Sequence, residues 1–188
     1  MRVEPAVWLW GAVLLITVPL PWLAAAALAV CVHELCHYVA VRAAGGRVFL
    51  LRIGIGGMVM ETDRLTSLQE LCCALAGPAG SLVLVCLYRW IPRTALCGLV
   101  QGAFNLLPVY PLDGGRVLRV LAGLCCSKRA DPVCVWVERT CLLLLVSLAG
   151  YLSIRYSMGI LPILMGIYLL FRLMERKIPC KPERHGVQ

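Results

Sequence analysis

One stretch near the start of the chain reads LPWLAAAALAVCVHELCHYVAV, from Leu20 to Val41. Every side chain in it is apolar or aromatic except His33, Glu34 and His37. Because about 20 such residues span the hydrocarbon core of a bilayer, the stretch predicts a membrane-spanning helix. Ionisable side chains inside such a helix cost at least about 2.5 kcal/mol each and usually have a function. We therefore expect these three residues to carry chemistry.

The three polar residues belong to the motif His33-Glu34-Leu35-Cys36-His37. Residues four apart lie on one face of a helix, so both imidazoles can reach the same metal ion. The glutamate beside the first histidine is placed to take a proton from a water molecule on that metal. The alternative is that the histidines only make hydrogen bonds between helices.

The composition of the whole chain is that of an integral membrane protein. Of its 188 residues, 61% are hydrophobic and 15% are charged, whereas soluble domains are about a quarter charged. This excludes a disordered protein and argues against a water-soluble fold. The net charge of +8 fits basic loops held on the cytoplasmic side better than nucleic-acid binding. The 11 cysteines include no CxxC pair and are expected to be mostly reduced thiols.

Further apolar segments predict an all-α polytopic membrane protein with about six transmembrane helices. These helices are expected at 6–18, 22–44, 67–88, 94–107, within 133–154 and at 157–171. Residues Arg47 to Arg64 are rich in β-formers around Gly54, Gly56 and Gly57, which predicts a hairpin after the second helix. The segment Val117–Cys126 is either a partial pass or an interfacial helix. Glu138 and Arg139 are expected to mark the watery end of the fifth helix.

A hydrolytic zinc ion needs three protein ligands and a water molecule. The third histidine of the chain, His185, lies in the polar tail, so the missing ligand is expected to be acidic. Asp113 is the candidate, in the segment NLLPVYPLDGG that begins at Asn105. Pro108 and Pro111 prevent a regular helix there, and irregular backbone at membrane depth has to line a cavity or be buried in protein. The alternative is that Asp113 caps the helix at Val117.

The HExxH motif in a hydrophobic helix, followed by NxxPxxPLDGG, resembles the site-2 protease family of intramembrane zinc metalloproteases. The compact layout is most similar to the branch of the stage IV sporulation protein FB. By this resemblance His33, His37 and Asp113 would bind one Zn2+ per chain, and Glu34 would be the catalytic acid and base. Asn105, Gly56 and Gly57 would contact the substrate, and the hairpin would be a membrane-re-entrant element that guides it.

The resemblance implies an endopeptidase that cuts within or next to membrane segments of protein substrates, near the cytoplasmic side. The sporulation branch further implies pro-sigma-factor processing and inhibitory or regulatory membrane partners. Both termini are expected in the cytoplasm, with 15 of the 18 lysines and arginines on that side. Residues 1–176 would form the protease core and 177–188 a basic tail, without the C-terminal regulatory domain that many members of the branch carry.

One departure from the family pattern and two alternative functions stay open at the level of sequence. Cys36 stands where the family usually has glycine, although its position turns it away from the face shared by the histidines. A transporter or channel could use the same polar residues to carry metal ions or protons, but they concentrate at one depth. An inactive homologue could bind partners without cutting them, but it would have no need of Glu34.

Overall fold

The structure is a computed structural model that describes residues 2–3, 14–54, 57–62, 65–125 and 130–156. The helices are α2 (Leu20–Ala43), α3 (Ser67–Cys86), α4 (Pro92–Asn105), α5 (Asp113–Cys125) and α6 (Ala130–Tyr156), and the strands are β1 (Arg2–Val3), β2 (Val48–Gly54) and β3 (Gly57–Thr62). Most of the expected helix at 6–18, and all of that at 157–171, lies outside the described residues. The chain divides into two compact units, Met1–Glu138 and Arg139–Gln188, and the described part of the second is the remainder of α6.

Three of the described helices are long and apolar enough to cross a membrane. They are Leu20–Ala43, Ser67–Cys86 and Ala130–Arg155. Large apolar side chains such as Leu35, Leu82 and Leu144 are more than half exposed on them. Exposed leucines on every long helix suit a hydrocarbon surrounding rather than water.

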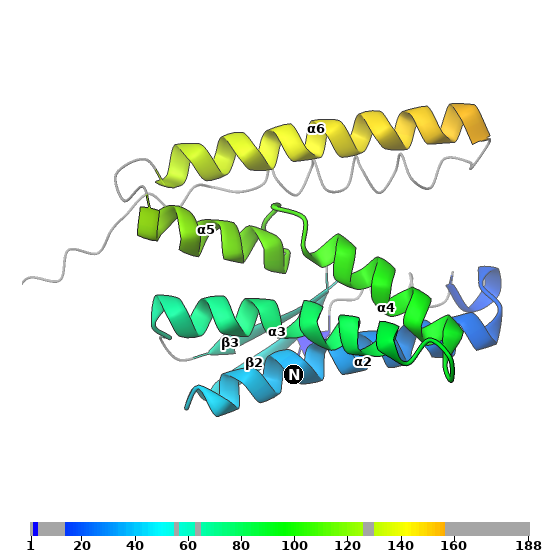
Figure 1. The fold of residues 1–188 in the computed structure, drawn as a ribbon, viewed down its shortest axis with the longest axis horizontal. Coiled ribbons are helices and arrows are strands. Elements are labelled where there is room, and N and C mark those ends of the chain that lie inside the picture. Colours follow the sequence, from blue (N-terminus) through cyan, green and yellow to red (C-terminus); the bar gives the residue numbers. More distant parts are fainter. Residues whose placement is uncertain (1, 4–13, 55–56, 63–64, 126–129, 157–188) are drawn as a thin grey trace, which may run out of the picture. The chain divides into compact units, whose positions relative to one another are not determined.

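Helices α2, α3 and α4 contact one another in the first unit, and α5 lies against α3 (Figure 1). The buried residues of α2 recur every fourth position along one stripe: Ala25, Ala29, His33, His37 and Val41. This spacing keeps them on one face of the helix. Both histidines of the motif therefore point into the helix bundle and not toward lipid.

The GxxxG pair of α4 packs against α3. A Cβ added to Gly102 would lie 2.9 Å from the Cβ of Ser81, and one added to Gly98 would lie 3.2 Å from Cδ1 of Leu84. Small residues allow two helices in a membrane to approach this closely. This close approach brings Ser81 into the centre of the bundle.

The start of α3 is fixed by a capping box. The Thr66 hydroxyl accepts a hydrogen bond from the backbone N–H of Gln69, and the Gln69 side chain accepts one from the Thr66 N–H at 2.9 Å. These bonds satisfy two donors that a helix start leaves unpaired. The Gln69 amide also donates to the carbonyl of Ala44 at 3.1 Å, which ties the beginning of α3 to the end of α2.

Strands β2 and β3 pair antiparallel, with Gly54 opposite Gly57. The short β1 adds a parallel third strand through Arg2 and Arg52, which the sequence did not predict. Whether these strands enter the membrane stays a prediction.

Helix α5 begins at Asp113, four residues before the segment expected at Val117. The preceding loop folds back onto its first turn. A Cβ at Gly114 would collide with the carbonyl oxygen of Leu106, and one at Gly115 would collide with the backbone nitrogen of Tyr110. The two glycines lie in the first turn of the helix and allow close packing of the loop.

Candidate metal centre

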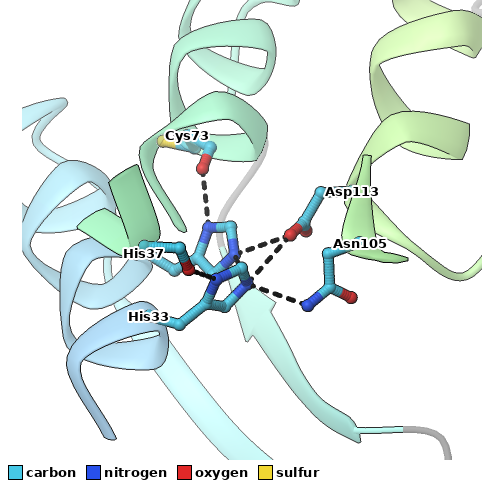
Figure 2. A network of polar contacts seen from close by, with 6 residues as sticks. His33, His37, Cys73, Asn105 and Asp113 are labelled. Carbon is cyan, nitrogen blue, oxygen red and sulfur yellow. Dashed lines mark hydrogen bonds and ion pairs between the residues drawn. The ribbon is translucent and has the colours of Figure 1, made fainter. Parts of the chain in front are cut away.

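Three side chains from two distant parts of the chain meet at one point. His33 and His37 are one turn apart on α2, and Asp113 is the first residue of α5 (Figure 2). The Oδ2 atom of Asp113 lies 3.1 Å from the Nε2 atom of each histidine, and the two Nε2 atoms lie 3.2 Å apart. All three residues are buried. The carboxylate expected from the second motif thus faces both imidazoles, and does not merely cap a later helix.

This donor set fits a zinc ion. Tetrahedral zinc binds imidazole nitrogen at about 2.0–2.1 Å and carboxylate oxygen at a similar distance, which spaces neighbouring ligand atoms by about 3.3 Å. The three observed separations are close to that value. Two nitrogens and one oxygen leave a fourth position open, as hydrolytic zinc sites require.

A glycine of α3 keeps the space beside these atoms free. A Cβ on Gly77 would collide with Nε2 of His37 and would lie 2.7 Å from Nε2 of His33. Any other residue at this position would therefore push a methylene or methyl group against the metal-facing nitrogens. Gly77 lies in an Ala-Gly-Pro run within an apolar helix, and no metal-binding motif marks its position in the sequence.

The outer nitrogens of both imidazoles are held by α3. His37 donates its Nδ1–H to the backbone carbonyl of Cys73 at 2.7 Å, and Nδ1 of His33 lies 2.9 Å from the Ser81 hydroxyl oxygen. A hydrogen bond at Nδ1 fixes the tautomer and leaves Nε2 with a free lone pair for a metal. Ser81 could have been suspected as the hydroxyl inside the apolar run Leu71–Cys86. The Cys73 carbonyl has no sequence signal, because it belongs to the backbone.

Two further polar groups lie at the same place. The Nδ2 atom of Asn105, the last residue of α4, is 3.3 Å from Nε2 of His33 (Figure 2). Glu34 is half-buried and interacts electrostatically with both histidines, with Asp113 and with Arg116. Arg116 lies one turn after Asp113 on α5 and is one of the basic residues expected on the cytoplasmic side. The structure adds it to the electrostatic surroundings of Glu34.

The thiol of Cys36 is directed away from this centre. A Cβ added to Gly80 would collide with the Cys36 sulfur, so the thiol occupies the space that this glycine leaves on α3. The metal-capable group found in the described part of the chain consists of His33, His37 and Asp113. A larger residue at position 36 is thus accommodated by a smaller one at position 80.

Of the two glycines expected to bind substrate, the structure describes one. Gly56 lies outside the described residues, and Gly57 is the first residue of β3, where its backbone pairs with Gly54. Their role is not tested by this geometry.

Comparison with known proteins bears on the identity of this centre. Residues 75–148 match the model of peptidase family M50. The zinc metalloprotease MJ0392 of Methanocaldococcus jannaschii is 28% identical over 158 residues, which cover 76% of this chain and 45% of that protein. The chain therefore spans less than half the length of this curated relative.

A solved structure shares the fold. The site-2 protease from Methanocaldococcus jannaschii superposes with a TM-score of 0.59 at 22% identity, covering 94% of this chain and 88% of that one. Over residues 75–148 this chain is therefore similar to peptidase family M50, it shares its fold with a solved site-2 protease, and its cluster of two histidines and one aspartate could hold a metal ion.

Proposed function

We propose that this protein is an intramembrane zinc endopeptidase that hydrolyses peptide bonds within or next to membrane segments of other proteins. The observation that carries the proposal is the cluster of three buried donor atoms, 3.1–3.2 Å apart, beside Glu34. The cluster lies between α3 and α2, both of which are apolar enough to span a bilayer. Ionisable side chains inside a membrane-spanning helix are costly, and a metal site that uses these side chains would explain why the chain keeps them.

In this proposal His33, His37 and Asp113 hold one zinc ion. Bound zinc lowers the pKa of a water molecule and polarises a peptide carbonyl. Glu34 accepts the proton of the attacking water and passes it to the leaving amine, which is the work of a general base and then of a general acid.

Substrate would be held on the side of the site where Asn105 lies. The amide of Asn105, close to Nε2 of His33, can donate a hydrogen bond to a peptide carbonyl near the metal. A substrate helix hides its carbonyls in internal hydrogen bonds and must unwind before attack. An unwound segment could pair with a strand edge near Gly56 and Gly57, as in recognition by strand addition.

The position of the cut and the biological role are also proposals. The excess of basic residues expected on the cytoplasmic side places both termini there and puts the zinc closer to that side. The proposal that the protein processes a pro-sigma factor during sporulation rests on the layout of the two motifs.

The test is zinc content and peptide cleavage of the full chain purified in detergent. The wild type should hold about one zinc per chain, His33→Ala should hold none, and Glu34→Gln should keep the metal but fail to cut a membrane-spanning reporter. The matched control is His185→Ala, which removes the third histidine of the chain, in its polar tail. A folded wild type that binds no zinc when zinc is supplied would refute the proposal. Metal binding by a wild type that cuts no membrane-spanning reporter would favour an inactive homologue or a metal carrier.

A further inference from the structure

A carboxylate on α6 is buried without belonging to the metal centre. Glu138 is only 1% exposed, whereas the sequence predicted that it marks the watery end of its helix. That expectation is wrong, because the side chain is buried. Burial of a carboxylate is costly unless it is paired and hydrogen-bonded, so its partners indicate what it does.

Two of its partners lie in the segment that leads into Asp113 and in α5. Glu138 Oε1 lies 3.5 Å from Nη2 of Arg119 and accepts a hydrogen bond from the backbone N–H of Tyr110 at 3.3 Å. The Arg119 guanidinium also stacks over the Tyr110 ring, with Cζ 4.1 Å from the ring centre. One carboxylate therefore holds the backbone of Tyr110, while the arginine that neutralises it holds the ring of the same residue.

Tyr110 is connected to the metal centre by a short, tightly packed segment. It stands three residues before Asp113, and its backbone lies against Gly115 so closely that a Cβ there would collide with it. The N–H of Leu112 donates to the carbonyl of Val109 at 2.9 Å, and the N–H of Arg116 donates to the carbonyl of Leu112 at 3.1 Å. Because this segment is closely packed and hydrogen-bonded, a displacement of Tyr110 would also move the first turn of α5, including Asp113.

We propose that Glu138 is a positioning residue for Asp113. It acts through Tyr110 and Arg119, and fixes the carboxylate of Asp113 at the distance from His33 and His37 that zinc requires. The inference rests on the proposed metal site and adds to it a residue 25 positions away in sequence. A hydrophobic residue at position 138 could fill the same space, but it could not accept the hydrogen bond of Tyr110.

The test is the rate at which the zinc-loaded protein loses its metal to a chelator. Glu138→Ala should release zinc about tenfold faster, the lower end of the 10–100-fold effect typical of residues that orient metal ligands. Glu138→Gln keeps an acceptor for the Tyr110 N–H and should recover much of the wild-type rate. Asp131→Asn, an exposed carboxylate on the same helix, is the matched control and should release zinc at the wild-type rate.

A second measurement separates positioning from general stability. Hydrogen exchange of the metal-free protein should speed up in Glu138→Ala at residues 106–116 and stay unchanged in α2. Uniformly faster exchange, or no rescue by Glu138→Gln, would show that Glu138 only stabilises the fold and would overturn the inference. Zinc release at the wild-type rate from Glu138→Ala would overturn it as well. A wild type that never binds zinc would instead refute the proposed function itself.

Discussion

The two halves of the metal centre are built in different ways. Helix α2 supplies His33 and His37 by helical spacing alone, since residues four apart share a face in any helix. Asp113 reaches the same point only because the chain between α4 and α5 folds back over Gly114 and Gly115. The histidine half is therefore set by local geometry, and the aspartate half by packing. Changes in packing should affect the two halves unequally.

The largest effect is expected from a substitution of the proposed general base, Glu34. Glu34→Gln should lower cleavage by about 10²–10⁴-fold, the usual contribution of a general acid and base. Zinc content should not change, because Glu34 is not among the three clustered donors. Cleavage of a membrane-spanning reporter and metal analysis of the same sample measure both quantities. Near-normal cleavage would show that the proton is taken up elsewhere.

Gly77→Ala should abolish zinc binding although none of the three metal-binding residues is substituted. Its Cβ would collide with Nε2 of His37 and crowd that of His33, so the helix would have to move away from the metal. The control is Gly123→Ala on α5, where a Cβ would meet nothing within 4 Å. Zinc content and thermal stability of both variants decide the question. Full zinc occupancy in Gly77→Ala would mean that α3 can yield at this point.

Gly114→Ala tests only the aspartate half of the metal centre, which depends on packing. A collision with the carbonyl of Leu106 should displace Asp113 and weaken zinc binding, while the two histidines keep their mutual geometry. We expect binding to fall but not vanish, because two imidazoles remain. Competition with a graded series of chelators measures the affinity. An unchanged affinity would show that the loop is free to relax, and that Asp113 is not positioned by this contact.

Ser81→Ala should have a smaller effect, on the histidine half. Without the hydroxyl 2.9 Å from Nδ1, His33 can adopt the other tautomer, and loss of such a partner typically costs 10–100-fold in metal affinity. Cys73→Ala provides a contrast, because the carbonyl that accepts from His37 belongs to the backbone and remains. Equal losses of affinity in the two variants would argue that packing, and not hydrogen bonding, sets the affinity.

The smallest effect is expected from Cys36→Gly. The thiol fills the space left by Gly80 on α3 and is not directed at the metal. Zinc content should be unchanged, and stability should fall slightly because glycine is unfavourable inside a helix by about 1 kcal/mol. A marked loss of zinc would show that the sulfur does take part in binding.

Much of this centre was accessible from the chain alone. The motif from His33 to His37 could be found because its polar residues interrupt an apolar run, and the Pro-rich segment before Asp113 because it breaks the next one. Ser81 could be recognised in the sequence as a hydroxyl within an apolar run, but it belongs to no known motif. The Cys73 carbonyl, the short strand β1 and the burial of Glu138 could not be found, since each depends on a segment far away in sequence.

The sequence by itself determined the membrane setting, the helix that carries both histidines and the identity of the carboxylate that joins them. These follow from hydropathy and from spacing, which are local properties of the chain. Only the tertiary structure decided that Gly77 keeps the metal side open, that Ser81 orients His33 and that Glu138 is buried against Tyr110. Such contacts join residues tens of positions apart, and close packing alone selects which of the many conceivable pairs meet.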